Sequence, residues 1–168
     1  CEMIAAMSDN PLELVKAYVA SGIFPGASFA IVNGQAIEKY VIGYECLRPE
    51  PVLLQTDMSY DLASVSKVVG TGTVMIDLVL SGQVELDALL IDYYPDFKGP
   101  GSTTLTIRQL LTHTSGIDPF IEKRHNLAYD ELRAALNQVT VTSDKTFHYT
   151  DVNFILLGFM LEEIYGQD

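Results

Sequence analysis

The sequence predicts an α+β fold in which an antiparallel hairpin precedes a mainly helical part. The first observation is Asn33-Gly34, which stands between two β-rich runs; both residues tolerate positive φ, as a tight hairpin turn requires. The second is the apolar patterning after residue 60, which is helical rather than alternating. The third is size, because 168 residues with 48% hydrophobic content can form one domain with a sizeable core.

The first 60 residues are expected to form a helix and two strands. Asn10 can cap a helix that has Pro11 at its first position, Glu13 completes a capping box, and Gly22 ends the helix. The two strands and the extended connection after them are expected over residues 27–32, 35–43 and 44–60.

Helices are expected to make up most of residues 61–168. Thr106-Ile107-Arg108-Gln109 is a capping box that opens a short helix ending at Leu111. The other helices are expected over residues 64–81, 129–138 and 151–165.

Two strands alone make a marginal sheet, so further strands are needed. Either another chain supplies them, or the sequence is the front part of a longer domain. We expect the second. Residues 1–168 would then be a single partial domain, with a helix and hairpin in 1–60, a mainly helical part in 61–168, and C-terminal strands missing. Association with a missing C-terminal segment or with a second copy of the chain is the corresponding expectation about partners.

The net charge of −12 argues against nucleic acid and anionic membrane surfaces as partners, because both require clustered Lys and Arg. No apolar run reaches transmembrane length, since the longest candidate is interrupted by Asp77, and no signal peptide is visible. A lipid anchor on Cys1 is disfavoured because the first helix starts soon after it. Cys1 and Cys46 do not define a disulfide framework. The compartment stays open between the bacterial cell envelope and the cytoplasm.

Ser64 and Lys67 are the first candidates for chemistry. On a helix, positions three apart share a face, so both side chains can point into one cleft. A serine hydroxyl needs a nearby base, and a lysine with a lowered pKa can serve. The N–H of Ser64, at the start of its helix, could also stabilise an oxyanion. The alternative is a capping serine beside a lysine that extends to the surface, and the spacing occurs roughly 0.4 times by chance.

Tyr149 is the second candidate, because it lies in a polar loop just before an apolar helix. Beside an ammonium group, its phenol would lose a proton more easily and could pass one on. The alternative is a surface tyrosine packed over a helix N-terminus that Asp151 caps.

The segment Leu110-Leu111-Thr112-His113-Thr114-Ser115-Gly116 reads as a rigid turn after a short helix, with hydroxyls and imidazole bonded to the backbone. No Gly-x-Ser-x-Gly elbow, no metal-ligand spacing of histidines and no Gly-rich phosphate loop occurs. We therefore expect neither a cofactor nor a metal.

Taken together and in order, these stretches resemble the serine β-lactamase and penicillin-binding-protein superfamily, in the branch of class C β-lactamases, D-alanyl-D-alanine carboxypeptidases and β-lactamase-fold esterases. The likeness spans nearly the whole chain. Its main elements are Ser64-Val65-Ser66-Lys67 as Ser-x-x-Lys, the segment from Leu110 to Gly116 between the motifs, and Tyr149-Thr150-Asp151 where the family carries Tyr-x-Asn. Further matches are Pro25-Gly26-Ala27-Ser28, Leu86-Asp87 and Tyr94-Pro95.

The resemblance implies a β-lactamase/transpeptidase-like fold and a serine hydrolase. Ser64 would be acylated, Lys67 would activate it, and Tyr149 would act as general base or proton relay. The substrate would be a small molecule or peptide with an amide or ester carbonyl: a β-lactam, a D-amino-acid peptide or a small ester. The alternatives are a non-catalytic penicillin-recognising sensor, a degenerate scaffold module or a generic helical interaction protein.

Two features depart from the family pattern. Asp151 stands at the asparagine position, where substrate binding is expected. Its carboxylate would either favour charged Lys67 and shift the base function to Tyr149, or mainly cap the helix while Asn153 faces elsewhere. The family's third motif, Lys-Thr-Gly or His-x-Gly on a strand, is absent from these 168 residues. We therefore expect this chain alone to be a poor catalyst, since losing an oxyanion donor costs on the order of 10² to 10³ in rate.

Overall fold

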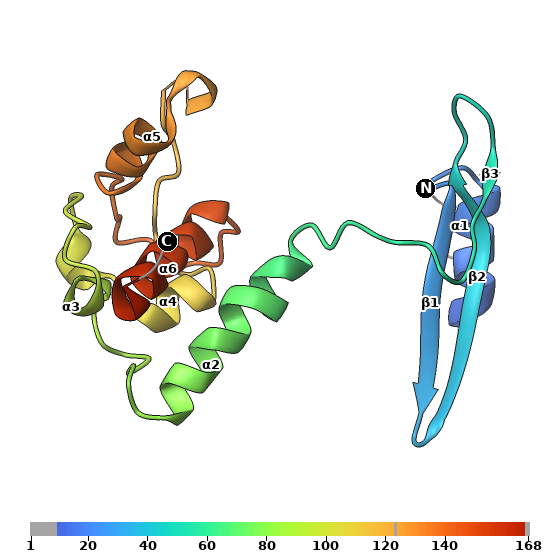
Figure 1. Ribbon diagram of the computed structural model, residues 1–168, viewed down its shortest axis with the longest axis horizontal. Coiled ribbons are helices and arrows are strands. Elements are labelled where there is room, and N and C mark those ends of the chain that lie inside the picture. Colours follow the sequence, from blue (N-terminus) through green and yellow to red (C-terminus); the bar gives the residue numbers. More distant parts are fainter. Residues whose placement is uncertain (1–9, 123, 167–168) are drawn as a thin grey trace. The chain divides into compact units, whose positions relative to one another are not determined.

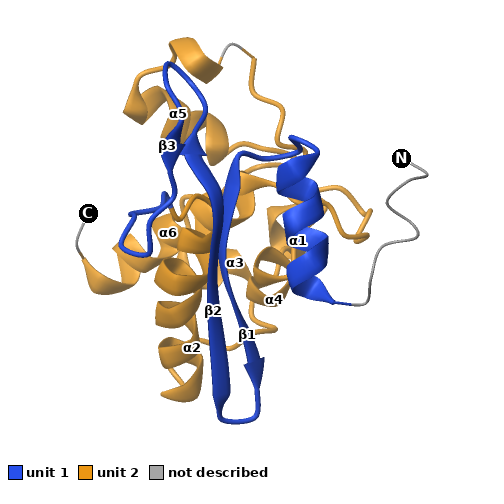
Figure 2. Cartoon of the chain, turned by 90° about the vertical axis from the view of Figure 1, so that its right-hand side faces the viewer, with its two compact units in different colours: residues 1–61 blue, residues 62–168 orange. Residues whose placement is uncertain are grey.

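The structure is a computed structural model that describes residues 10–122 and 124–166. The chain divides into two compact units, Cys1–Asp61 and Leu62–Asp168, coloured separately in Figure 2. In the described part of the chain, the first unit holds one helix and a small antiparallel sheet, and the second holds the other helices. Each unit is described by itself below.

Helix α1 (Pro11–Ala20) begins where the sequence predicts it. The Asn10 side chain accepts a hydrogen bond from the Leu12 N–H at 3.0 Å, and Gly22 follows the helix with φ of 72°. Asn10 is confirmed as the N-cap, and the Glu13 carboxylate forms an exposed ion pair with Lys16, whose Nζ lies 2.9 Å away.

Strands β1 (Gly26–Asn33) and β2 (Ala36–Cys46) form the predicted hairpin. They pair antiparallel from Gly26 opposite Gly43 to Asn33 opposite Ala36. The turn residues are therefore Gly34 and Gln35, one position later than predicted, and Gly34 supplies the positive φ of 60°. Glycine at the first turn position is the usual requirement of a type II′ hairpin turn.

The connection expected over residues 44–60 contains more structure than predicted. Strand β2 continues to Cys46, and a short strand β3 (Val52–Leu53) pairs antiparallel with it, which gives the order β1-β2-β3. The sheet is thus three-stranded rather than two-stranded. Gly43 allows a close approach at the start of the hairpin, since a Cβ there would lie 2.4 Å from the Pro25 carbonyl oxygen.

The second unit is built from helices in the order expected. The predicted helix 64–81 is observed as a π-helical segment, Lys67–Gly72, followed directly by α2 (Thr73–Leu80). The short helix after Thr106 is α4 (Ile107–Leu111), and the last two are α5 (Tyr129–Leu136) and α6 (Asp151–Tyr165). Short elements that the sequence did not predict are α3 (Leu90–Tyr93) and the 3₁₀ turns Ser102–Thr104 and Arg124–Asn126. Figure 1 labels the α-helices.

Helix α6 is the centre of the second unit's core. Its Leu156, Leu157 and Met160 side chains have no exposed surface, and the helix packs against α3 and α4, as Figure 1 shows. Leu90 and Leu110 are equally inaccessible on those two helices. Each such side chain contributes about 1.5–3 kcal/mol through burial, so α6 has a fixed position in this unit.

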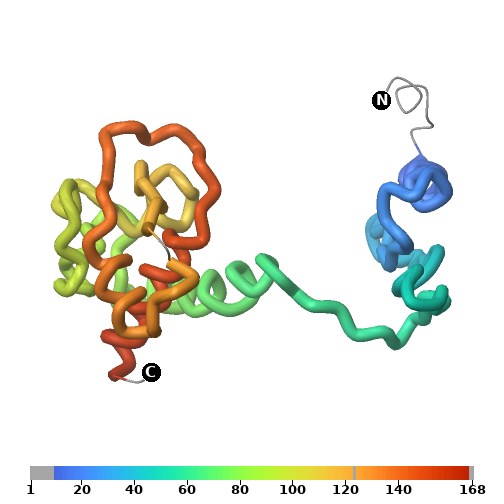
Figure 3. Tube along the Cα trace, turned by 90° about the horizontal axis from the view of Figure 1, so that it is seen from above, coloured from blue at the N-terminus to red at the C-terminus, as the bar shows by residue number. Residues whose placement is uncertain are grey.

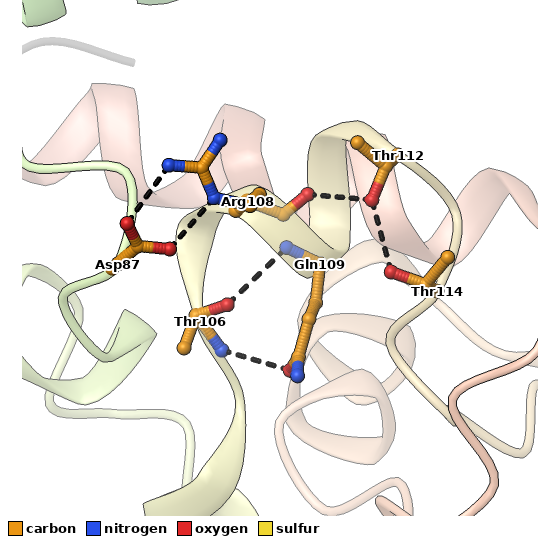
Figure 4. Close-up of polar contacts among 6 residues, drawn as sticks. All are labelled: Asp87, Thr106, Arg108, Gln109, Thr112 and Thr114. Atoms are coloured by element: carbon orange, nitrogen blue, oxygen red, sulfur yellow. Dashed lines mark hydrogen bonds and ion pairs between the residues drawn. The ribbon is translucent and has the colours of Figure 1, made fainter.

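Helix α4 is fixed at its start by a capping box and by an ion pair (Figure 4). Thr106 Oγ1 accepts from the Gln109 N–H at 3.3 Å while Gln109 Oε1 accepts from the Thr106 N–H at 3.2 Å, which is the predicted capping box. Arg108 donates to both oxygens of Asp87 at 2.7 and 2.8 Å, and this ion pair lowers the pKa of Asp87. The segment that follows α4 therefore starts from a well-defined position.

A long segment without helices joins α5 to α6 and is seen from above in Figure 3. It is attached to the segment after α4 by a β-bridge between Ile117 and Val141 and by a hydrogen bond from the Thr142 N–H to the Gly116 carbonyl at 2.8 Å. Through these contacts the residues after α4 and those before α6 lie side by side. Among the described residues, no helix has the length and apolar character needed to cross a membrane.

Candidate active site

The structure brings Ser64, Lys67 and Tyr149 together within the second unit. Lys67 Nζ donates a hydrogen bond to Ser64 Oγ at 3.1 Å, and the Tyr149 hydroxyl donates to the same oxygen at 2.8 Å. Tyr149 is 85 residues from Ser64 in the sequence, so this contact depends on the fold. Both groups that the sequence proposed as bases therefore lie at hydrogen-bond distance from the candidate nucleophile.

Ser64 lies at the sharp start of a helical segment. Ala63, just before it, has a φ of 43°, a left-handed conformation that costs a residue with a Cβ about 1–2 kcal/mol. The Ser64 carbonyl accepts from the Lys67 N–H at 3.1 Å, which places the two side chains one turn apart on the same face. The π-helical Lys67–Gly72 then follows, and π-helical turns of this kind are frequent at functional sites.

Asp151 is the charge partner of Lys67. Its Oδ1 lies 2.7 Å from Lys67 Nζ, and the Lys67 side chain is 18% exposed whereas that of Asp151 is 67% exposed. The hydrogen bond to Asp151 raises the pKa of Lys67, with Tyr149 adding to the effect. Lys67 is therefore a firmly held ammonium group at neutral pH, and it lacks the lone pair that a base needs.

The two alternatives for Asp151 can be told apart in this geometry. The cap of α6 is Thr150, whose Oγ1 accepts from the Val152 N–H at 3.3 Å, while Asp151 reaches to Lys67. The suggestion that Asp151 caps the helix is wrong, because the neighbouring threonine occupies that position. Asn153 is fully buried and faces the segment after α4.

The charges of Lys67 and Asp151 also change the pKa of Tyr149. The hydrogen bond to Lys67 is the largest influence and, together with the bond to Ser64, lowers the pKa of the Tyr149 phenol. Lys67 Nζ also lies 5.3 Å from the centroid of the Tyr149 ring. The Asp151 carboxylate acts in the opposite direction and raises this pKa.

The structure adds His113 and Asn153 to the site, although neither was among the predicted site residues. The imidazole of His113 packs on the Tyr149 ring, with 4.5 Å between the centroids. Its Nδ1 is 2.9 Å from Asn153 Nδ2 and 3.4 Å from the Thr150 N–H. The backbone contact agrees with the prediction that this imidazole bonds to the backbone. The pairing with Asn153 and Tyr149 has no local sequence signal.

An open cavity of about 500 Å³ lies beside Ser64, lined by Ser64, Lys67, Thr71, Asp151 and Ile155 among others. A second cavity of about 870 Å³ has Tyr149 in its wall and shares Asp151 and Ile155 with the first. A substrate thus has room on either side of Asp151. Within residues 10–122 and 124–166, no group of three or more His, Cys, Asp or Glu side chains is arranged to hold a metal ion.

A family model described as Beta-lactamase matches residues 13–168, almost the whole chain. The chain belongs to the Beta-lactamase family. Class C β-lactamases share its fold: one in complex with cefoxitin has a TM-score of 0.74 at 20% identity, and one from Rhodobacter sphaeroides has 0.72 at 23% identity. The match covers 92% and 90% of this chain and 43% of each of those chains. The predicted β-lactamase/transpeptidase-like α+β fold is confirmed.

Sequence relatives of this family member include "Protein flp" of Staphylococcus aureus (strain COL), which is 29% identical over 87% of this chain and 31% of that protein. A putative D-alanyl-D-alanine carboxypeptidase of Salmonella agona (strain SL483) is 29% identical over 70% of this chain and 31% of that protein. The chain therefore spans about a third of the length of these curated relatives. The resemblance to the serine β-lactamase and penicillin-binding-protein superfamily, over its N-terminal portion, is confirmed.

Proposed function

We propose that this Beta-lactamase family member is a serine hydrolase that forms an acyl-enzyme on Ser64 from an amide or ester carbonyl. One observation carries the proposal: Ser64 Oγ lies within hydrogen-bond distance of both Lys67 Nζ, at 3.1 Å, and the Tyr149 hydroxyl, at 2.8 Å. A serine hydroxyl becomes a useful nucleophile when an adjacent group takes its proton.

In the acylation step, Tyr149 is the general base. Once the phenol has lost its proton, the 2.8 Å contact reverses, and the Ser64 hydroxyl donates to the phenolate. Ser64 Oγ forms a bond to the substrate carbonyl carbon as its proton moves to Tyr149. The tetrahedral intermediate then breaks its bond to the leaving group, which takes the proton from Tyr149.

Lys67 stays protonated through this cycle. Its ammonium group favours the phenolate of Tyr149, which is why the pKa of Tyr149 is lowered, and it holds Ser64 Oγ in place. The N–H of Ser64, at the start of its helical segment, is the proposed donor to the developing oxyanion.

In the deacylation step, water attacks the ester that links the acyl group to Ser64. Tyr149 takes the proton of the water, the bond between the carbonyl carbon and Ser64 Oγ breaks, and Ser64 regains a proton from Tyr149. The step releases a carboxylic acid and restores the starting state. The same phenol thus serves as base twice and as acid twice.

Asp151 is the proposed substrate contact. One of its oxygens binds Lys67, and its side chain is 67% exposed at the boundary of the two cavities. A carboxylate there accepts hydrogen bonds but donates none, so it favours substrates that present an N–H or an ammonium group near the scissile carbonyl. A structural neighbour described as a D-amino acid amidase, from Ochrobactrum anthropi SV3, shares the fold at 23% identity, with a TM-score of 0.66.

A penicillin-recognising sensor is the second candidate, and Asp151 is the observation that favours it. Its carboxylate opposes the loss of the Tyr149 proton, which weakens the base proposed for both steps. A strained β-lactam carbonyl reacts with Ser64 even when the base is weak, whereas hydrolysis of the resulting ester depends more strongly on that base. Such a protein would be acylated at Ser64 and would release the acyl group slowly.

The test uses the intact protein with a chromogenic cephalosporin, a p-nitrophenyl ester and a D-alanyl-D-alanine peptide, beside a Ser64→Ala variant. Turnover of one of these that the variant lacks supports the hydrolase. A stable adduct on Ser64 without turnover, seen by mass spectrometry after a fluorescent penicillin, supports the sensor. The absence of both adduct and turnover refutes acylation at Ser64, which leaves the scaffold.

A further inference from the structure

We propose that His113 is a positioning residue, whose neutral imidazole ring holds the Tyr149 phenol against Ser64. The two ring centroids are 4.5 Å apart with 35° between the ring planes, which is a tilted stack. Tyr149 itself is 49% exposed, so one side of its ring needs a fixed neighbour if the hydroxyl is to stay 2.8 Å from Ser64 Oγ. The proposal rests on the proposed role of Tyr149 as base.

The protonation state of His113 follows from its partners. The backbone N–H of Thr150 can only donate, and it points at His113 Nδ1 from 3.4 Å. The second partner of that atom is Asn153 Nδ2, at 2.9 Å. Nδ1 must therefore carry its lone pair toward both, and the proton of the neutral imidazole resides on Nε2.

The orientation of Asn153 is fixed by a separate contact. Ser115 Oγ accepts from the Ile117 N–H at 3.2 Å and donates its own hydrogen to Asn153 Oδ1 at 2.7 Å. Because Oδ1 is engaged there, the amide NH₂ of Asn153 is the end that faces His113. Ser115 and Asn153 are both buried, at 2% and 0% exposure, so water offers little alternative partner.

The hydrogen bonds that link His113, Asn153 and Ser115 extend to the side chain of Lys145. Lys145 Nζ donates to the Ser115 carbonyl at 2.6 Å, and burial lowers the pKa of Lys145. The imidazole ring also contacts Phe147 and Phe154, at centroid distances of 6.0 and 5.3 Å. His113 is thus held in one place by hydrogen bonds at Nδ1 and by aromatic rings around it.

Among the charged groups around His113, Lys67 favours the neutral form of the imidazole and Asp151 opposes it. Lys67, Asp151 and Tyr149 face it from the nucleophile side, and Lys145 lies beyond Ser115. His148 adjoins through its backbone N–H, which donates to the His113 carbonyl at 2.8 Å. Burial and then the Lys67 charge lower the pKa of His113, while Asp151 opposes them. A neutral ring adds no cation beside the Tyr149–Lys67 pair.

Two substitutions test the contribution of the His113 ring separately from that of its hydrogen-bond acceptor, Nδ1. His113→Asn removes the ring but keeps a side-chain acceptor and suits the φ of 55° at this position, which asparagine tolerates well. His113→Phe keeps the ring but removes the acceptor. The matched control is His148→Asn, which changes an exposed side chain and leaves its backbone bond to His113 intact.

Two measurements on the intact protein test whether His113 positions Tyr149. The first is the rate at which a fluorophosphonate labels Ser64 as a function of pH. The second is the titration of Tyr149, followed by NMR with ¹³C-labelled tyrosine. His113→Asn should slow labelling at least tenfold and move the Tyr149 midpoint upward, toward the ordinary value of about 10. His113→Phe should leave that midpoint close to that of the unaltered protein, and His148→Asn should change neither measurement. The ¹⁵N spectrum of His113 should show a protonated Nε2 and an unprotonated Nδ1.

A Tyr149 midpoint that His113→Asn leaves unchanged would overturn the proposal, as would equal shifts in the Asn and Phe variants. A proton on Nδ1 would overturn it too. If His113→Phe fails to fold, the Asn variant and the ¹⁵N spectrum still decide. If the unaltered protein fails to label at all, the hydrolase proposal fails, whereas the Tyr149 titration continues to test the role of His113.

Discussion

Asp151 Oδ1 lies 2.7 Å from Lys67 Nζ, at the position where the Tyr-x-Asn motif has an asparagine. This contact makes Lys67 a paired ammonium group, and it is the reason why Tyr149, which also contacts Ser64 Oγ, is the base that we propose. The carboxylate has two opposing consequences for Tyr149. It keeps Lys67 charged, which lowers the pKa of the phenol, and it raises that pKa directly by its own negative charge.

Replacing Asp151 by asparagine should shift the pH dependence of Ser64 acylation to lower pH. The substitution removes a charge that raises the pKa of Tyr149 and keeps a group that can accept from Lys67. With Tyr149 as base, the rate rises as the phenol loses its proton, so a lower pKa moves that rise to lower pH. Labelling rates between pH 6 and 11 give the midpoint. Asp130→Asn, an exposed charge in the first turn of α5, should leave it in place.

Replacing Lys67 by methionine should raise the pKa of Tyr149, because the hydrogen bond to Lys67 is the largest influence that lowers it. At neutral pH the phenolate fraction then falls, and acylation should slow by about 10²- to 10⁴-fold, the range typical of losing acid–base assistance. Titration of Tyr149 by absorbance or NMR checks the pKa, and fluorophosphonate labelling checks the rate. A Tyr149 midpoint that stays where it was would contradict the electrostatic coupling.

Tyr149→Phe should abolish the rising pH limb and reduce acylation by a similar factor, about 10²- to 10⁴-fold. The variant keeps the ring that packs on His113 and removes only the hydroxyl 2.8 Å from Ser64 Oγ. Its thermal stability should therefore stay close to that of the unaltered protein. If acylation keeps its normal rate and pH limb, Tyr149 is not the base.

Leu157→Ala should lower the free energy of unfolding by about 2–5 kcal/mol, since it leaves a cavity at a position with no exposed surface. The effect reaches the site because Asp151 is the first residue of α6 and Tyr149 directly precedes its N-cap, Thr150. Chemical denaturation measures the change. Glu163→Ala, on the exposed side of α6, should stay within about 0.5 kcal/mol. Equal losses in the two variants would contradict the position assigned to the helix.

The parts of the fold that local chemistry determines could be predicted from the sequence. The capping box of Thr106 and Gln109 has the bonds expected, and α6 has the predicted bounds. Strand β3 was missed because two residues among prolines carry no alternating pattern. The π-helical Lys67–Gly72 was missed because a single wider turn does not disturb apolar periodicity.

In the candidate site, too, some features could be predicted from the sequence and others could not. The spacing of Ser64 and Lys67 predicted that they share a helix face. Whether Asp151 caps the helix or pairs with Lys67 could be decided only from the three-dimensional structure. Thr150 and Asp151 are both good capping residues in sequence, and only the position of Lys67 Nζ distinguishes them. The stacking of His113 on Tyr149 joins two segments that no periodicity connects.

The buried His113 should make the protein less stable in mild acid. Its pKa in the folded state is lowered, chiefly by burial and then by Lys67, relative to about 6.5 in the unfolded chain. The unfolded state therefore binds a proton first, and the stability present above pH 6.5 is lost as the pH falls through the lowered folded-state value. The slope in that window is at most about 1.4 kcal/mol per pH unit for one group.

The carboxylates with lowered pKa, Asp87 and Asp144, lose their contributions only below about pH 4, so the two windows can be separated. His113→Asn should flatten the pH dependence of the free energy of unfolding directly below pH 6.5, while leaving the loss below about pH 4. Urea denaturation at half-unit pH steps measures both. A slope in the upper window that persists in this variant would assign the acid sensitivity to another group.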